Sequence, residues 1–283
     1  MKLNISGRHL IEQITAHPDD IDKIDFSRIS LDTMRWADLL LEQGATAFHL
    51  MAYYGKLALL PKEWLTSENL IALVNTEGDT PLHKAAEINE LATFPKELLT
   101  KENLILRGRD NTSVLHSVVR MNGVKHVSPA VISSLSAEDW LKDPHALRTA
   151  YSTGHIPILP KVFLEPEFML KPDEAGTTHF HHAVCGGNLH QLPDYYKNPD
   201  LLELKGKQGT PLDYAAIWDN LDAIPFLALD SCGLVPADRL DKVKKLIGLM
   251  HPSNRDHEQL APLRAALEAD WTHVGRNQEW AAL

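Results

Sequence analysis

The segment HFHHAVC, residues 179–185, holds the side chains that come closest to a chemical site in this chain. His179, His181, His182 and Cys185 are types that can bind zinc, and a cysteine can also act as a nucleophile. Their spacing matches no standard zinc pattern, and no separate base accompanies the cysteine. A helix that begins near this segment would also point these side chains in different directions. We therefore predict no metal site and no catalytic residue here, with a metal- or redox-sensing module as the alternative hypothesis.

Sequence motifs of the common enzyme classes are absent from the 283 residues. The chain contains no P-loop, GxSxG, HExxH or dinucleotide-binding pattern. We accordingly predict a protein that is not an enzyme and that uses no cofactor and no small-molecule substrate. The alternative is an effector in which residues 227–283 carry an enzymatic activity, although nothing in that segment pairs an acid, a base and a nucleophile.

Composition indicates a globular protein with enough apolar material for a core, since 44% of the residues are hydrophobic and 23% are charged. The formal net charge of -10 argues against nucleic acid and against an anionic membrane as ligands. A protein partner with a basic or neutral surface patch is the better electrostatic match. The two cysteines, Cys185 and Cys232, cannot build a disulfide framework, and a reducing compartment is expected.

The N-terminal sequence MKLNISGRHL lacks the apolar stretch of a signal peptide. No apolar run approaches the roughly 18 to 20 residues that are needed to span a bilayer. We therefore expect a cytoplasmic protein, while export into a host by a specialised secretion system would leave no recognisable mark.

A recurring unit organises the middle of the chain. The phrase TPLHKAA at residues 80–86 returns as TPLDYAA at residues 210–216. A period of about 33 residues connects a series of equivalent anchor positions, which are spaced by 34, 33, 32, 33 and 32 residues. These positions are His49, His83, His116, Arg148, His181 and Asp213.

When the copies are aligned on these anchors, residues at three further positions agree with the same period. Two and three residues after the anchors, the residues are small or plainly apolar except at Tyr151, as closely stacked helices require. Six residues after the anchors come types that tolerate a left-handed backbone and end helices, namely Gly55, Asn89, Asn122, Gly154, Gly187 and Asp219. A proline follows farther along each copy, at Pro61, Pro95, Pro129, Pro160, Pro193 and Pro225.

The unit resembles the ankyrin repeat over about residues 43–226, most clearly in GDTPLHKAA (78–86) and GATAFHLMA (44–52). Thr80 is placed to cap an inner helix, and Pro81 suits a first helical position. The resemblance implies that His49, His83, His116 and His181 are equivalent, largely buried and locally hydrogen-bonded. It also implies an all-α solenoid of about six helix-pair units, with approximate bounds 43–75, 76–108, 109–141, 142–174, 175–206 and 207–226.

The second half of each unit departs from the common ankyrin pattern. Stretches such as LLPKEWLTSENL (59–70) place proline where only the first turn of a helix tolerates it, so we predict a short outer helix that starts late. A second helix start follows at Thr66, Thr100, Ser136 and Asn198, each of which precedes acidic residues and an apolar pair. An extra helical turn should therefore lead into the next unit.

Both ends of the chain are predicted to be helical caps. Residues 1–42 lead into the repeats through the helix-like stretch LDTMRWADLLLEQ (31–43). Residues 227–283 contain amphipathic stretches at 236–250 and 258–271. A stacked array needs a polar outer surface at each end, but the C-terminal segment is longer than a cap requires.

The predicted function is non-catalytic protein–protein interaction, as an adaptor, an effector or an inhibitor. The resemblance leaves the turn tips and the ends of the inner helices exposed on a concave face, where an apolar ridge framed by charge would bind the partner. The alternative is that the aromatic side chains pack beneath the two caps. The predicted partner-binding residues are Tyr53, Tyr54, Glu77, Glu87, Ile88, Asp110, Arg120, Met121 and Trp218.

Overall fold

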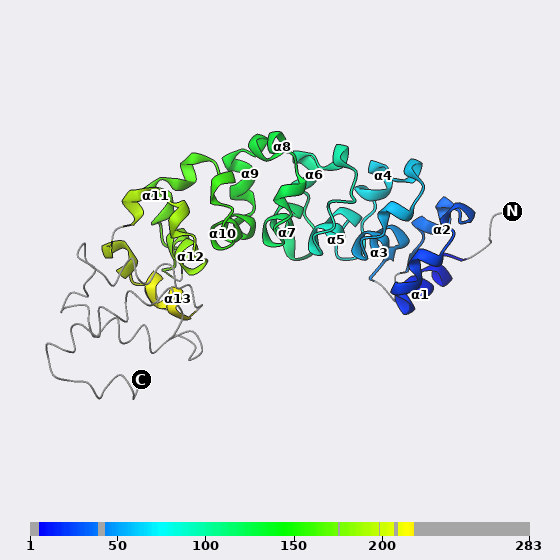
Figure 1. The fold of residues 1–283 in the computed structure, drawn as a ribbon, viewed down its shortest axis with the longest axis horizontal. Helices are drawn as coiled ribbons and strands as arrows, with labels where there is room; N and C mark the ends of the chain where they lie inside the picture. Colours follow the sequence, from blue (N-terminus) through cyan, green and yellow to red (C-terminus); the bar gives the residue numbers. More distant parts are fainter. Residues whose placement is uncertain (1–5, 39–42, 175, 198, 207–208, 218–283) are drawn as a thin grey trace, which may run out of the picture. The chain divides into compact units, whose positions relative to one another are not determined.

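The backbone of the chain is mostly helical wherever the structure describes it (Figure 1). This secondary structure agrees with the predicted all-α class. The structure is a computed structural model, and it describes residues 6–38, 43–174, 176–197, 199–206 and 209–217.

The chain divides into two compact units, Met1–Thr149 and Ala150–Leu283. The α-helices of the first unit are α1 (Gly7–Ala16), α2 (Leu31–Arg35), α3 (Ala47–Tyr53), α4 (Ser67–Leu70), α5 (Pro81–Glu87), α6 (Lys101–Leu104), α7 (Val114–Arg120), α8 (Pro129–Ser134), α9 (Ala137–Lys142) and α10 (Pro144–Ser152), the last of which crosses the boundary. Its 3-10 helices are Pro18–Lys23, Phe26–Arg28, Leu57–Leu59, Lys62–Trp64, Lys96–Leu98, Arg109–Asn111 and Gly123–His126.

The described part of the second unit follows the same style of short elements. Its α-helices are α11 (Pro166–Met169), α12 (His179–Cys185) and α13 (Pro211–Ile217). Its 3-10 helices are Ile156–Ile158, Lys161–Leu164, Leu189–Gln191, Asp194–Tyr196 and Pro199–Glu203.

The N-terminal helix α1 packs against α2 and α3. The Ser6 hydroxyl caps α1 by accepting the backbone N–H of His9, and the apolar side of the helix is fully buried at Leu10, Ile11 and Ile14. Burial of such side chains stabilises the fold by roughly 1.5–3 kcal/mol each. Helix α1 therefore covers helices α2 and α3.

The helix predicted over residues 31–43 is wrong beyond Arg35. Helix α2 ends there, and strand β1 (Ala37–Asp38) pairs antiparallel with strand β2 (Ala45–Thr46). Gln43 and Gly44, which lead into β2, have positive φ angles of 52° and 74°. A left-handed backbone at these two residues is incompatible with a helix that reaches residue 43.

The inner helices α3, α5 and α7 share one length and one type of start. Each has seven residues and follows a hydroxyl residue at the cap position, which is Thr46, Thr80 or Ser113. Helix α3 packs against α5, and α5 packs against α7 (Figure 1). Buried alanines such as Ala85 and Ala86 allow the close approach that the small-residue column predicted.

The residues that were predicted to end the inner helices do so in both compact units. Each of its described members lies two residues beyond an inner helix and has a left-handed backbone, with φ between 56° and 80°. Glycine and asparagine adopt this conformation at the lowest cost, so they end the helices at fixed positions. The confirmed members are Gly55, Asn89, Asn122, Gly154 and Gly187, and Asp219 lies outside the described residues.

In each repeat, the segment that follows the inner helix is more irregular than the late, short α-helix that was predicted there. A proline stands directly before a 3-10 helix in four copies, at Pro61, Pro95, Pro160 and Pro193, and only Pro129 begins an α-helix, α8. Proline fixes φ for entry into a turn, but it lacks the N–H that a continuing α-helix needs. The second helix start is confirmed at Thr66, Thr100 and Ser136, which precede α4, α6 and α9, whereas Asn198 and Pro225 lie outside the described residues.

Helix α10 departs from the register that was predicted from Arg148. The helix begins after Asp143, whose carboxylate accepts the backbone N–H of Ala146, and it runs for nine residues. Arg148 therefore lies in mid-helix and is exposed, and it does not occupy the third helical position that His49 and His83 share. The reason is local, since Asp143 and Pro144 supply a cap and a first helical residue two positions early.

Tyrosine hydroxyls hold the outer segments of the second unit in place. The buried Tyr151 donates to the carbonyl oxygen of Phe163 at 2.8 Å. Tyr195 and Tyr196 both donate to the carbonyl oxygen of Leu164, at 2.8 and 2.7 Å. These bonds satisfy backbone oxygens that the irregular segments leave without helical partners.

Candidate partner-binding site

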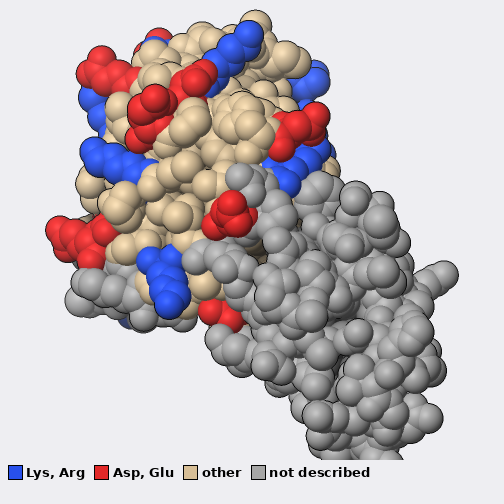
Figure 2. Space-filling model, turned by 90° about the vertical axis from the view of Figure 1, so that its left-hand side faces the viewer, with Lys and Arg blue, Asp and Glu red and all other residues tan. Residues whose placement is uncertain are grey.

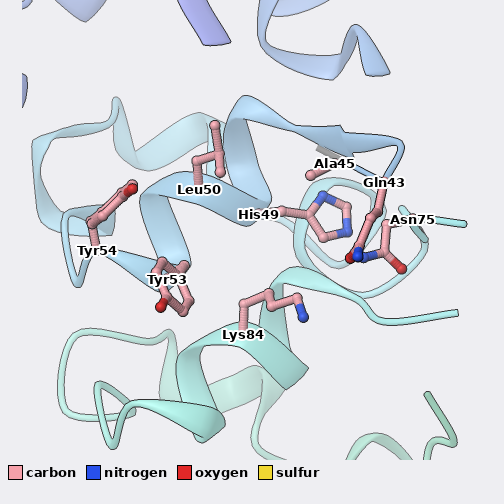
Figure 3. Close-up of a pocket in the computed structure, with 8 residues that line it drawn as sticks. All are labelled: Gln43, Ala45, His49, Leu50, Tyr53, Tyr54, Asn75 and Lys84. Atoms are coloured by element: carbon pink, nitrogen blue, oxygen red, sulfur yellow. The ribbon is translucent and has the colours of Figure 1, made fainter. Parts of the chain in front are cut away.

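A pocket of about 160 Å³ lies in the first unit, where α3 faces α5 (Figure 3). Figure 3 shows its lining side chains on these two helices and on the turns that lead into them. The volume suits a single side chain, because sites for cofactors and drug-sized ligands usually measure about 300–1,000 Å³. The lining residues are Gln43, Ala45, His49, Leu50, Tyr53, Tyr54, Asn75 and Lys84.

An aromatic pair stands at the end of α3. The rings of Tyr53 and Tyr54 meet edge to face, with centroids 5.2 Å apart and planes at 78°. Tyr54 is half-buried, while 44% of Tyr53 is exposed, so the alternative of burial beneath the N-terminal segment does not hold for Tyr53. Tyrosines at such positions are typical anchors of protein interfaces.

Tyr54, Ile88 and Met121 occupy one structural position, as predicted. Each is the first residue after its helix, with φ between −110° and −90° and ψ between 5° and 11°. All three side chains are half-buried, and Arg120 beside Met121 is exposed. Trp218 directly follows α13 and lies outside the described residues.

The charged residues that were predicted to frame the apolar ridge form a network of paired charges. Glu87 lies 3.4 Å from the Lys84 ammonium and 3.8 Å from the Arg109 guanidinium, and Glu77 lies 3.5 Å from the same guanidinium. Asp110 is 4.0 Å from Arg109, and its side chain is 86% exposed. The carboxylates of Glu77 and Glu87 are thus paired with cations, while that of Asp110 is largely exposed.

Sequence reasoning missed Asp79, Lys84 and Arg109, which join this network. The carboxylate of the buried Asp79 lies 2.7 Å from the Lys84 ammonium and accepts the backbone N–H of Arg109 at 2.9 Å. Burial acts to raise the pKa of Asp79, but these two partners hold it below its ordinary value. The spacing of Lys84 and Glu87, three residues apart on one helix, was the signal that could have revealed the pairing.

Gln43 connects the charge network to the pocket. With its amide oriented to satisfy both groups, the Gln43 side-chain nitrogen donates to the two carboxylate oxygens of Glu77, at 2.8 and 3.2 Å. The backbone carbonyl of Gln43 also accepts from the backbone N–H and the hydroxyl of Thr76. The turn at Gln43 is therefore hydrogen-bonded to the turn at Thr76 and Glu77, at the rim of the pocket.

Three of the anchor histidines cap their own helices. The Nδ1 atoms of His49, His83 and His181 accept the backbone N–H of the cap threonine three residues earlier, at 3.1 to 3.2 Å. A backbone nitrogen can only donate, so Nδ1 carries no proton and the ring proton is on Nε2. These imidazoles are therefore neutral structural groups in this arrangement.

The Nε2 atoms of two of these rings reach the following segment. His49 donates to the carbonyl oxygen of Asp79 at 3.0 Å, and His83 donates to that of Leu106 at 3.2 Å. The Nε2 of His181 lies near the carbonyls of Leu204 and Gly209 but makes no hydrogen bond of ordinary geometry among the described residues. Burial lowers the pKa of all three rings, to about 4 for His49.

The prediction that His116 is buried in the same way is wrong. Its ring is half-buried and lies 6.0 Å from the ring of His145. The backbone N–H of Ser113, which the ring would have accepted, instead donates to the carboxylate of Asp143 at 3.2 Å. An ionised carboxylate is the stronger acceptor, and it replaces the imidazole.

The side chains of HFHHAVC do not converge on one point. The ring of His179 is stacked between Tyr151 and Phe168, with centroids 5.0 and 4.9 Å away, while His181 turns toward its cap threonine. Burial raises the pKa of the Cys185 thiol, which disfavours the reactive thiolate. Among the described residues, no three His, Cys, Asp or Glu side chains are grouped as a metal ion would need.

Acidic and basic side chains are interspersed on the face of the molecule in Figure 2. No helix in the described ranges combines the length and the hydropathy that a membrane crossing requires. Residues 227–283, for which an enzymatic activity was the alternative, lie outside the described residues.

The comparisons with protein families and with curated proteins find no match for this chain. No protein-family profile matches it, and no curated protein matches it at a significant level of sequence similarity. The functional assignment therefore depends on the repeated geometry and on the surface around Tyr53.

Proposed function

We propose that this protein is a non-catalytic, ankyrin-type repeat protein that binds a protein partner through the surface formed by the ends of α3, α5 and α7. The observation that carries the proposal is a helical unit that recurs with the same type of capping residue, the same helix length and the same type of helix-ending residue. Thr46 with His49, Thr80 with His83, and Thr178 with His181 form the same reciprocal capping box in three copies.

Hydrogen bonds between successive copies support the repeat. Side-chain bonds join residues that are 30 to 37 positions apart, close to one repeat period. A helix pair of this size cannot bury its own apolar faces, so contacts of this kind are what a stacked array needs. The final copy uses a carboxylate in place of the histidine, since Asp213 accepts the backbone N–H of Thr210 at 3.0 Å.

The surface at the ends of the inner helices is the part of the array that is best suited to a partner. It combines an exposed aromatic ring at Tyr53, three equivalent half-buried residues and a rim of charged groups. An apolar centre with a polar rim is the usual anatomy of a protein interface. We propose that the protein acts there as an adaptor, an effector or an inhibitor, in the cytoplasm of its own cell or of a host.

Replacing Tyr54 by alanine tests the proposed surface. We expect partner binding to weaken by about 2 kcal/mol, roughly 30-fold in Kd, because the variant removes an aromatic anchor. The partner is first captured from the source cells with the whole chain, and its Kd is then measured by calorimetry for wild type and variant. Lys62→Ala, on the exposed outer turn Lys62–Trp64, is the control and should bind like wild type. If Tyr54→Ala also binds like wild type, the surface has been assigned to the wrong face.

Replacing Glu77 by lysine should mainly slow association. The change places a second cation beside Arg109, which Glu77 now contacts at 3.5 Å, and it repels the basic patch expected on the partner. We expect the association rate to fall several-fold at low salt and the difference to shrink at 0.5 M salt, while the dissociation rate changes little. Stopped-flow measurements at several salt concentrations check this. A faster association would mean that the partner presents an acidic patch.

A further inference from the structure

We infer that the pocket between α3 and α5 receives a neutral carboxamide side chain, a glutamine or an asparagine of the protein partner, an assignment that rests on the binding function proposed above. The pocket volume of about 160 Å³ is below that of typical small-molecule sites. Tyr53 and Tyr54, at the end of α3, are among its lining residues. The pocket therefore belongs to the surface that is assigned to the partner.

The side-chain amide of Asn75 defines the kind of group that the pocket accepts. Asn75 lines the pocket, and only 7% of the residue is exposed. Its Oδ1 atom accepts the backbone N–H of Glu77 at 3.0 Å and that of Asp79 at 2.9 Å. Because two donors meet at this atom, the orientation of the amide is fixed and the other atom is Nδ2. Nδ2 makes no hydrogen bond to any of the described residues, yet it is not sealed from solvent.

A group that enters the pocket must supply an acceptor for this donor. A ligand group that displaces water without replacing its hydrogen bond loses affinity, and the oxygen of a carboxamide replaces it. Gln43, whose amide lies at the same end of the pocket in Figure 3, donates to Glu77 through its nitrogen and keeps its amide oxygen as an acceptor. The NH2 group of a carboxamide can donate to that oxygen. A guanidinium or an ammonium offers donors alone, and an aliphatic side chain offers neither.

The charges of the lining residues favour a neutral occupant. Lys84 is the cation among them, and its ammonium is already held by Asp79 at 2.7 Å and by Glu87 at 3.4 Å. His49, which also lines the pocket, is neutral because its Nδ1 accepts a backbone N–H. A carboxylate could accept from Asn75, but it would lose its hydration beside a cation that is already paired. A carboxamide accepts the same hydrogen bond without that cost.

Three small probes of nearly the same shape test the assignment on the full chain. Propionamide carries an acceptor and a donor, propionate carries acceptors alone, and propionamidinium carries donors alone. In asparagine-labelled protein, NMR follows the side-chain NH2 signal of Asn75, which is identified by its absence in Asn75→Asp. We expect propionamide to shift this signal saturably with a Kd of about 10–50 mM. The other two probes should bind about 2- to 10-fold more weakly, the range that one neutral hydrogen bond gives. The NH2 signal of Asn69, which already donates to the carbonyl oxygen of Trp64 at 2.8 Å, should not move.

Asn75→Asp provides a matched variant. The carboxylate keeps an acceptor for the two backbone N–H groups, but it places an oxygen where Nδ2 stood. Propionamidinium should therefore bind this variant more tightly than propionamide does, through a charge-assisted hydrogen bond. Binding is read at the ring signals of Tyr53 and Tyr54, which also line the pocket. A residue with a purely structural role would not reverse the ranking of the probes, and the ranking on wild type is measured independently of this variant.

Three results on the wild-type protein would overturn the assignment. Equal binding of propionamidinium would show that no acceptor is required, preferred binding of propionate would show that Lys84 dominates the pocket, and no shift with any probe would show that the pocket takes no side chain. If propionamide fails while Tyr54→Ala still weakens partner binding, only the carboxamide assignment is lost. If propionamide binds while Tyr54→Ala leaves partner binding unchanged, the pocket is not the partner's site and the inference about the partner fails with the proposed surface.

Discussion

Replacing Asp143 by alanine should destabilise the protein by about 3–5 kcal/mol, the range observed when one partner of a buried charge pair is removed. Asp143 is buried, and its carboxylate accepts from the backbone N–H and the hydroxyl of Ser113 and from the backbone N–H of Ala146. It also lies 3.1 Å from the guanidinium of Arg107. The alanine variant leaves these donors unsatisfied in a buried site, and that loss sets the expected magnitude.

Two matched variants make this result specific. Asp143→Asn keeps an acceptor oxygen but loses the charge, so we expect a smaller loss of about 1–2 kcal/mol. Asp110→Ala removes a carboxylate whose side chain is 86% exposed and should stay within about 0.5 kcal/mol of wild type. The free energies of unfolding are obtained from urea titrations followed by circular dichroism. Equal stability of Asp143→Ala and Asp110→Ala would contradict the role of Asp143 as the residue that caps the starts of both α7 and α10.

Acidification from pH 7 to pH 5 should cost about 2 kcal/mol of folding free energy through His49 alone. Burial lowers the pKa of His49 from 6.5 in the unfolded chain to about 4 in the folded protein. The unfolded state therefore takes up the proton first, so the stabilisation is fully present above pH 6.5 and is lost as the pH falls toward 4. His83 and His181, whose pKa values are also lowered by burial, add to the loss in the same direction.

The titration of His49 can be separated from its capping role. Glutamine at the third helical position also accepts the backbone N–H of a cap threonine, but it does not titrate. We expect His49→Gln to flatten the dependence of unfolding free energy on pH by about 2 kcal/mol between pH 7 and pH 5. A His49→Gln slope as steep as that of wild type would show that this imidazole does not sense acid.

The paired charges around the pocket show where reasoning from the sequence stopped. The positions of Tyr54, Ile88 and Met121 followed from the repeat register, and the structure places them at one equivalent position. The contact of Arg109 with Glu77 and Glu87 did not follow, because Arg109 lies in a turn 32 residues after Glu77 and 22 residues after Glu87, where spacing gives no side-chain direction. The pocket between α3 and α5 depends on the same kind of distant contact.

The amino-acid sequence by itself determined where the inner helices begin and end. Thr80 with His83 starts a helix, and Gly55 or Asn89 ends one, because capping and left-handed backbone depend on residues that are close along the chain. The tertiary structure alone decided that Asp143 replaces an imidazole at α7, and that Ala37–Asp38 pairs with Ala45–Thr46 where the sequence predicted a helix. In these places two local solutions compete, and contacts with residues of a neighbouring segment select the one that satisfies the buried backbone groups.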